Sequence, residues 1–432
     1  MQKTLLSIIF IFSLSVNPLW AQRYSVGTYM FKDGSEYSGE LVKKKPYGKG
    51  KCIWPDGNVY EGNWIISKRQ GHGVMTYSEK NERYDGEWFD DMPHGTGSYY
   101  FDNNNRYVGL WYKGIRQGQG KMYYFTGDVY EGNWTNNERD GQGRYTWKDG
   151  AYYEGQWKND ERHGTGTFVW EDGSSYSGEM SHNARNGNGV YHFVDGDTYT
   201  GNWKDDVQHG KGRYEFRNGD VYEGDYQDGE RTGQGSFTSA DGNKYIGHFL
   251  NGNQDGKGTF YWTNGAVYDG NWKDNQMHGH GIYTWSNGDV YDGEWKDNLM
   301  DGEGSLRLAD GTIYKGTFAK GKKEGAGVMM APNGHRLVGF YKNDLMDGPF
   351  EETDAQGTVL AKASYLNGVL QTGSFVNLQA GDTQGVQTAE GLLIGTFSAE
   401  HVAADEAAKV KEQQQQKRAS TRKRVTRRRR RR

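Results

Sequence analysis

Cysteine and proline are almost absent from this 432-residue chain, which has one cysteine, Cys52, and six prolines. A single cysteine excludes an internal disulfide framework and a cysteine-based zinc site. Hydrophobic residues of all kinds reach only 34%, a deficit that favours disorder, yet disordered chains are also poor in aromatics. Here 62 residues are aromatic and 65 are glycine. This combination predicts a thin β structure whose rings pack over glycines, in place of a thick aliphatic core.

Long apolar segments are also missing after the N-terminus, where no run approaches the ~18 residues that cross a bilayer. Residues 1–21 contain a short one, in which Lys3 precedes an apolar stretch from Leu5 to Val16 and the small Ala21 follows. This pattern is typical of a secretory signal peptide cleaved near Ala21; an uncleaved N-terminal anchor is the alternative. The absence of cysteine near the cut excludes a lipoprotein anchor. We therefore expect an exported chain (periplasmic, cell envelope or extracellular) with no transmembrane segment in its mature form.

Charge is distributed unevenly along the chain. Residues 1–416 hold 41 basic and 56 acidic residues, a net charge of −15, whereas residues 417–432 hold 11 basic residues and no acid. A run of one charge predicts a disordered, solvated tail. Two further roles stay open for it, contact with an anionic ligand and docking on the acidic body of another copy. The candidate anion-binding residues are the last six, Arg427, Arg428, Arg429, Arg430, Arg431 and Arg432.

A Tyr-x-Gly unit recurs along most of the chain at intervals of 23 residues, with one interval of 24. Counting its tyrosine as position 0, glycine follows at +2, an aromatic usually at +4, Gly-x-Gly at +11 to +13, large apolar residues at +15 and +17, and Asp/Asn-Gly at +19 and +20. All 13 tryptophans after the signal occupy +4 or +17. The unit begins at Tyr37, Tyr60, Tyr84, Tyr107, Tyr130, Tyr153, Tyr176, Tyr199, Tyr222, Tyr245, Tyr268, Tyr291 and Tyr314, and Leu337 continues the series.

The spacing within each copy predicts two antiparallel strands. Positions 0, +2 and +4 differ by two, as do +11 to +17, so the side chains of each set share one face of a strand. In the copy at residues 130–152 we expect the strands to be joined by the six residues 135–140. Keeping all rings on one face pairs Tyr130 with Tyr145, Gly132 with Gly143, and Trp134 with the glycine at 141.

The register between copies depends on the Asp-Gly turn. A three-residue loop over 149–151, with its glycine at positive φ, keeps the rings of successive copies on one face. This loop predicts Trp147 opposite Tyr153, Tyr145 opposite the glycine at 155, and Gly143 opposite Trp157.

The repeats divide the chain into segments. We expect a signal peptide at 1–21, an N-terminal half-repeat at 22–36, a repeat array at 37–359, a degenerate capping repeat with a C-terminal extension at 360–400, a helix at 401–416 and the Arg-rich tail at 417–432. The fold class is therefore all-β: an elongated single-layer antiparallel meander of about 14 tandem 23-residue β-hairpins.

Tyr-x-Gly-x-Trp followed by Gly-x-Gly at this spacing resembles the MORN repeat (membrane occupation and recognition nexus), over roughly residues 24–350. The resemblance implies an elongated β-hairpin array that serves as a scaffold, a dimerisation surface or a lipid-proximal module. Relatives that carry a kinase or methyltransferase activity have it in a separate domain, and nothing in this chain resembles such a domain. The secretion signal departs from the family's usual setting.

Catalytic and metal-binding motifs are weak by comparison. The Gly-x-Gly pairs precede strands and lack G-x-x-x-x-G-K-[ST], which argues against a phosphate loop. Four histidines occupy the same position, +10, of their copies, so the repeat pattern accounts for them without a metal site: His94, His163, His209 and His278. His278 and His280 share a face and leave a weak metal site open, and Cys52 occupies the packed +15 column. We expect no enzyme activity and no cofactor.

The aromatic face remains as the candidate binding surface, although its rings can equally be core and nothing more. Exposed rows of tyrosine and tryptophan suit protein partners, because aromatics dominate binding hot spots. We therefore expect a scaffold that binds a protein partner or itself as a homodimer; the alternative is a module for anionic lipid or polysaccharide, anchored by the Arg-rich tail. Nucleic acid is not expected. The candidate residues are Tyr130, Trp134, Trp147, Tyr153, Trp157, Tyr268, Trp272, Trp285, Tyr291 and Trp295.

Overall fold

The computed structural model describes residues 24–374. They form 31 β-strands, and no helix long and apolar enough to cross a membrane is found among them. The prediction of an all-β chain of tandem antiparallel hairpins is confirmed. The predicted signal peptide, the extension after 374, the helix at 401–416 and the Arg-rich tail lie outside the described residues.

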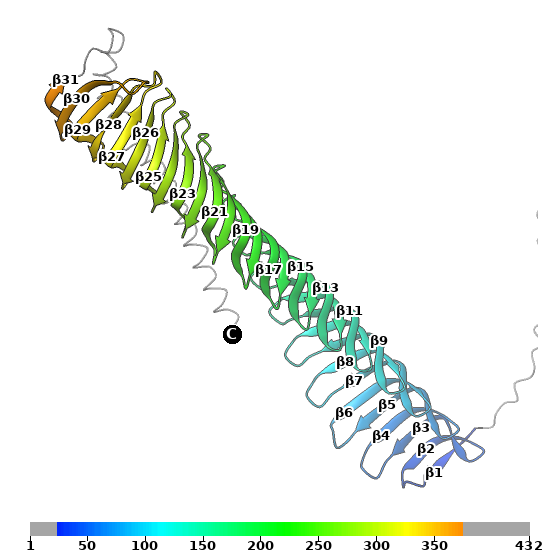
Figure 1. The fold of residues 1–432 in the computed structure, drawn as a ribbon. Helices are drawn as coiled ribbons and strands as arrows, with labels where there is room; N and C mark the ends of the chain where they lie inside the picture. The colour runs from blue at the N-terminus through cyan, green and yellow to red at the C-terminus, as the bar shows by residue number, and fades with distance from the viewer. Residues whose placement is uncertain (1–23, 375–432) are drawn as a thin grey trace, which may run out of the picture. The chain divides into compact units, whose positions relative to one another are not determined.

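The chain divides into two units, of which the first ends at Arg217. Within this unit each strand pairs antiparallel with its neighbours in sequence, which makes a simple meander (Figure 1). Its strands are β1 (Ser25–Met30), β2 (Glu36–Val42), β3 (Lys45–Ile53), β4 (Val59–Ile65), β5 (Lys68–Tyr77), β6 (Glu82–Phe89), β7 (Met92–Tyr100), β8 (Arg106–Tyr112), β9 (Ile115–Tyr123), β10 (Val129–Thr135), β11 (Glu138–Thr146), β12 (Tyr152–Lys158), β13 (Glu161–Val169), β14 (Ser175–Ser181), β15 (Ala184–His192), β16 (Thr198–Lys204) and β17 (Val207–Glu215).

The second unit begins at Asn218 and repeats the same arrangement. Its neighbouring strands are again antiparallel. They are β18 (Val221–Gln227), β19 (Glu230–Thr238), β20 (Lys244–Leu250), β21 (Asn253–Tyr261), β22 (Val267–Lys273), β23 (Gln276–Thr284), β24 (Val290–Lys296), β25 (Leu299–Arg307), β26 (Ile313–Ala319), β27 (Lys322–Met330), β28 (Arg336–Lys342), β29 (Leu345–Thr353), β30 (Val359–Leu366) and β31 (Val369–Ser374).

The hairpin β10–β11 shows how one copy folds. Tyr130 lies opposite Tyr145 and Gly132 opposite Gly143, as predicted. The predicted six-residue link is wrong, because Asn136 and the following asparagine close a two-residue turn with φ of 50° and 71°. Such a turn needs positive φ at both central residues, which asparagine tolerates.

The two-residue turn leaves more residues in the second strand of the hairpin than in the first, and a β-bulge accommodates the difference. A β-bulge between Gly132 and Trp134 takes up the extra residues, and Trp134 therefore lies opposite Arg139 and not opposite Gly141 as predicted. The bulged strand carries a glycine at φ 100°, Gly141, where a side chain would be strained. The long second strand thus begins directly after the turn.

The predicted register between copies is also wrong, by two residues. Gly143 lies opposite Gly155, Tyr145 opposite Tyr153, and Gly141 opposite Trp157. The three-residue loop exists but begins one residue earlier, because the Trp147 amide donates to the carbonyl of Ala151 at 2.8 Å and closes the loop over 148–150. The Ala151 amide in turn donates to the Asp149 carboxylate at 3.0 Å.

A shift of two residues leaves every side chain on its predicted face. The rings lie on one face of each unit's sheet, here called the ring face, and polar side chains such as Glu131 lie on the opposite, outer face. The tyrosines at position 0 from Tyr37 to Tyr291 are the largest fully buried side chains. The ring face is therefore the core of the repeat array.

Candidate functional site

The ring-face residues singled out from the sequence differ in how much of each a partner can reach. Trp147 and Trp285 are half-buried. The others are at most 5% exposed: Tyr130, Trp134, Tyr153, Trp157, Tyr268, Trp272, Tyr291 and Trp295. Within each unit these residues form part of the packed core of the sheet. The proposal that they form a binding face stays a prediction, with the two half-buried tryptophans as its accessible part.

Hydrogen bonds hold the buried rings in one geometry. The Tyr130 hydroxyl donates to the carbonyl of Asn133 at 3.0 Å, and the ring lies so close to Gly143 that a Cβ there would come within 2.2 Å of the hydroxyl oxygen. The Trp157 indole donates to the Gly143 carbonyl at 3.1 Å. Tyr130 meets Trp134 and Trp157 edge to face, with centroids 5.2 and 5.3 Å apart, the arrangement that aromatic quadrupoles favour.

Burial also removes the acid–base chemistry of these tyrosines. Burial raises the pKa of Tyr153 to about 12 and raises the pKa of Tyr130, Tyr268 and Tyr291 as well. Burial in a low-dielectric environment disfavours the phenolate, and at Tyr130 and Tyr153 this effect outweighs the opposing attraction of the nearby Arg139 and Arg162. These hydroxyls therefore act as fixed hydrogen-bond donors at physiological pH.

The half-buried tryptophans belong to a second, more accessible row of rings. Trp147 packs between Tyr145 and Phe168, with centroids 4.6 and 5.0 Å away. Trp285 likewise lies 4.6 Å from Tyr283. Because both indoles are only half-buried, they are the candidate residues that a ligand can reach on the ring face.

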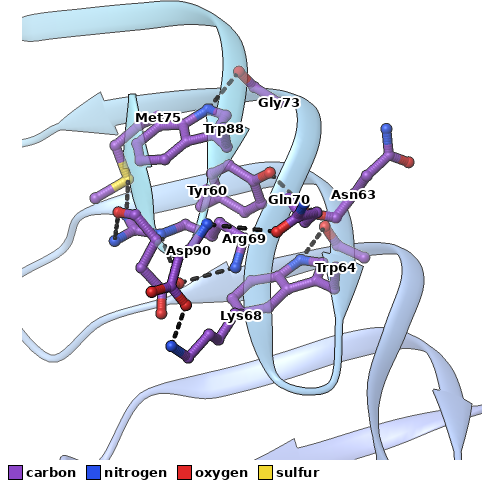
Figure 2. Close-up of polar contacts among 12 residues, drawn as sticks. Tyr60, Asn63, Trp64, Lys68, Arg69, Gln70, Gly73, Met75, Trp88 and Asp90 are labelled. Atoms are coloured by element: carbon purple, nitrogen blue, oxygen red, sulfur yellow. Dashed lines mark hydrogen bonds and ion pairs between the residues drawn. The ribbon is translucent and has the colours of Figure 1, made fainter. Parts of the chain in front are cut away.

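Arginine side chains cover rings of the ring face and bind the turn of the following copy; we call each such arginine a clamp. The sequence analysis missed these contacts. Arg69 lies 4.4 Å above the Trp88 ring and 5.8 Å from Tyr60 (Figure 2). Its backbone and guanidinium donate to the Asp91 carboxylate at 2.8 and 3.3 Å, and Nη2 donates to the Asp91 carbonyl at 2.8 Å. Lys68 pairs with Asp90 at the same turn. Each clamp thus ties one copy to the turn of the next.

The same clamp recurs in other copies, which supplies the signal that sequence reasoning could have used. Arg139 stacks at 4.3 Å on Trp157 and donates to the carboxylate and carbonyl of Asp160 at 2.8 and 2.7 Å. A base at +9 with Asp or Asn at +7 of the following copy identifies it. Arg116 and Arg185 stack in the same way on Trp134 and Trp203 of the following copy and donate to the carbonyl at its +7. Arg162 also donates to the +7 carbonyl of the following copy, but the ring it stacks on is Phe168 of its own copy.

The outer face of the first unit is mostly polar, but large apolar side chains gather on it at β6 and β8. Val108, Leu110 and Tyr112 lie on this face of β8, and Phe89 lies on the same face of β6, 38, 39, 50 and 52% exposed respectively. We call these four residues the apolar patch. The corresponding positions of the next copy are Glu131, Asn133 and Thr135, so the repeat pattern does not require apolar residues there.

His94 lies inside the apolar patch. Its ring stands between Phe89 and Tyr112, with centroids 5.5 and 5.3 Å away. Within residues 24–374, its buried Nδ1 has no hydrogen-bond partner. An unsatisfied buried polar atom costs free energy, so a bound group that formed a hydrogen bond with Nδ1 would remove this cost.

Metal-binding and nucleophilic chemistry finds no support in the described part of the chain. No three His, Cys, Asp or Glu side chains between residues 24 and 374 lie close enough together to hold a metal ion. His280 instead lies 3.0 Å from Asp292. Burial raises the pKa of the Cys52 thiol, which disfavours the reactive thiolate.

Solved structures offer only distant similarity. The TCP domain of SAS-4 from Drosophila melanogaster, in complex with a proline-rich motif of Ana2, is 16% identical with a TM-score of 0.24 over 36% of this chain and 85% of that chain. The TCP10 domain of CPAP from Danio rerio is 12% identical, with a TM-score of 0.14 over 62% and 99%. Virginiamycin B lyase from Staphylococcus aureus with quinupristin is 14% identical, with a TM-score of 0.12 over 74% and 94%.

A family model matches the repeats themselves. No match is found among curated proteins. The MORN repeat model, in contrast, matches 13 tandem segments, the first at residues 37–59 and the last at 314–336. These segments follow the hairpins described above, and all 13 begin at the buried tyrosine of position 0. Repeats of this kind are generally interaction modules for proteins or membranes, and proteins built from them are typically non-enzymatic. The chain belongs to the MORN-repeat family.

Proposed function

We propose that this protein is an exported, non-enzymatic scaffold that binds a protein partner on its β-sheet. The apolar patch on β6 and β8 carries the proposal. It gathers two aromatic and two aliphatic side chains on a face that is otherwise mostly polar, and none of the four is needed for the core. Exposed apolar groups of this kind favour protein association.

The neighbouring copies support this assignment by contrast. Their outer faces carry Glu131 and Asn133 on β10, and Thr200 and Asn202 on β16, while the ring face is unchanged. A chain that needed only to fold would tolerate the same polar residues on β8. The unpartnered Nδ1 of His94 adds a polar contact for a donor from the partner.

The test is to copy the polar face of β10 onto β8. The triple variant Val108→Glu, Leu110→Asn and Tyr112→Thr introduces residues that the next copy already carries, so we expect it to fold normally. Cross-linking and pull-down from the exporting cell should recover the partner with the wild-type chain and lose it with the variant. The matched control replaces Thr200 by Glu on the outer face of β16.

Different measurements test the protein partner, self-association and export. Equal recovery by the triple variant and the wild type would contradict the patch as the binding surface. Self-association is tested by light scattering of the purified chain at micromolar concentration, where a monomer contradicts a homodimer. Export is tested by fractionation and by sequencing the mature N-terminus, which we expect near residue 22.

The alternative is a surface-binding module for anionic lipid or polysaccharide. The observation in its favour is the charge of residues 417–432, because consecutive arginines attract phosphate groups while the acidic body is repelled. Deleting residues 417–432 should then abolish binding to anionic vesicles, and raising the salt concentration should weaken it. Binding that survives the deletion would contradict this role of the tail.

A further inference from the structure

Within residues 24–374, one edge of the first strand of the array pairs with β2 and the other edge has no strand partner. In a complete copy the second strand lies between two first strands, as β3 lies between β2 and β4. β1 corresponds to a second strand, because its Gly27 and Tyr29 pair with Gly39 and Tyr37 of β2 as Gly50 and Cys52 of β3 pair with β4. Among the described residues β2 is its one strand partner.

The ring face of β1 has space over Gly27 in which a tyrosine ring would fit; we call this space the seat. In the next copy the Tyr37 ring covers Gly50, so that a Cβ on that glycine would lie 2.1 Å from the ring. The equivalent Gly27 has no ring over it within the described residues. The nearest atom to a Cβ placed there is the Leu41 Cδ1, at 3.1 Å. Among the described residues, no side chain takes the place over Gly27 that the position-0 tyrosine takes in a complete copy.

The outer face of β1 is unusually apolar for this array. Val26 and Met30 are 85% and 60% exposed, whereas the second strand β11 carries Gln142 and Thr146 at the corresponding positions. An added strand would bury these side chains if its own outer face were apolar, since cross-strand neighbours stabilise a sheet in pairs. An exposed strand edge also offers backbone donors and acceptors to an incoming chain.

We infer that β1 is a binding site for an extended Tyr-x-Gly-x-aromatic segment of a partner protein, which adds antiparallel to its free edge with apolar residues at the x positions. The ligand glycine would lie opposite Gly27 and the ligand tyrosine opposite Tyr29, as the first and second strands of every complete copy pair. This site is separate from the apolar patch, so either can be correct without the other.

The chain itself supplies the probe. A peptide of residues 106–112, RYVGLWY, has the required pattern with Val108 and Leu110 on its outer face. Labelled peptide is titrated by fluorescence anisotropy into the chain of residues 22–432, the expected mature form. We expect saturable binding and slower hydrogen exchange of residues 25–30. The peptide of residues 129–135, VYEGNWT, should bind several-fold more weakly, because its outer face is polar.

Matched variants locate the seat. Gly27→Ala should weaken binding at least about tenfold, since the new methyl group takes the space of the ring, whereas Thr28→Ala on the opposite face should change it less than about twofold. Hydrogen exchange in β2 must match the wild type, which shows that the variant keeps its fold. A peptide with Gly109→Ala should also lose binding, because a Cβ there meets the paired glycine at 2.5 Å in the array.

Four results would overturn the inference. The first is the absence of saturable binding, and the second is binding that is insensitive to both alanine substitutions. The third is loss of peptide binding in the full chain with residues 1–21 retained, which would assign the edge to that segment. The fourth is a dimer that Gly27→Ala abolishes and peptide does not displace, which would assign the edge to a second copy.

Discussion

Replacing Lys323 by methionine should stabilise the second unit at neutral pH. Lys323 occupies the +9 position on β27, where Arg139 forms a clamp and where Met277 and Met300 also occur. It is 5% exposed. Its Nζ lies 5.1 Å from the centroid of Tyr314 and 5.8 Å from that of Tyr341, and burial lowers its pKa to about 8.

The size of the effect follows from this pKa. Holding a lysine pKa near 8 when the ordinary value is 10.5 costs the charged side chain about 3 kcal/mol, at ~1.4 kcal/mol per pH unit. The attraction of the ammonium group to the tyrosine rings offsets ~1 kcal/mol. We therefore expect Lys323→Met to raise the free energy of unfolding by about 2 kcal/mol at pH 7.

The gain should depend on pH with a defined sign. The unfolded chain binds the Lys323 proton more tightly than the folded chain, so the stability of the wild type rises as pH increases from about 8 to 10.5. The methionine variant lacks this rise, and its advantage should shrink over the same window. Ionisation of unfolded tyrosines near pH 10 destabilises both chains alike and cancels in the difference.

Urea denaturation at pH 7 and pH 9.5, followed by circular dichroism, measures the difference. Hydrogen exchange of residues 313–342 at pH 7 shows whether the gain is local, as expected for a repeat array in which copies contact only their neighbours. Lys315→Met, on the exposed outer face of β26, is the control. A variant less stable than the wild type at pH 7, or an advantage that does not change with pH, would refute the reasoning.

Three further predictions test the core. Gly143→Ala should lower the free energy of unfolding by about 3 kcal/mol, because its Cβ would displace the Tyr130 ring and its hydrogen bond; Gln142→Ala, an exposed neighbour, should change the thermal midpoint little. Arg139→Ala should cost about 1–2 kcal/mol in urea denaturation through loss of the stack on Trp157 and of two hydrogen bonds, and an equal loss in Lys158→Ala would contradict the clamp. Stability should fall as pH rises from about 10 toward 12, because burial raises the pKa of tyrosines such as Tyr153; ultraviolet titration would disprove this if all tyrosines ionised together near pH 10 in the folded chain.

Much of the fold could be predicted because the pattern is local and repeated. The alternation at 0, +2 and +4 places Tyr130 and Trp134 on one face, and the pairing of Tyr130 with Tyr145 follows from requiring one ring face for both strands. The candidate binding face was less predictable, since spacing identifies a shared face but not its exposure. Trp147 and Trp157 belong to the same face, yet one is half-buried and the other 5% exposed.

The sequence analysis missed the side-chain contacts between copies, because their pattern becomes visible only when the +9 and +7 positions of successive copies are compared. The clamp from Arg139 to Asp160 spans 21 residues and acts through a stack on Trp157, so neither partner looks special in its own copy. The apolar patch is also invisible in the repeat pattern. Phe89 and Tyr112 come from copies that are otherwise ordinary, and His94 between them occupies a recurrent histidine column.

The sequence by itself determined the unit, its two strands and the side of the sheet on which each residue lies, because these depend on a period of two that any antiparallel pairing preserves. Tertiary structure alone decided the turn, the bulge and the register between copies. A slip of two residues exchanges partners without moving a side chain to the other face, so the hydrophobic pattern cannot choose between the registers. The observed register pairs Gly143 with Gly155, and it is set by the loop that closes between Trp147 and Ala151.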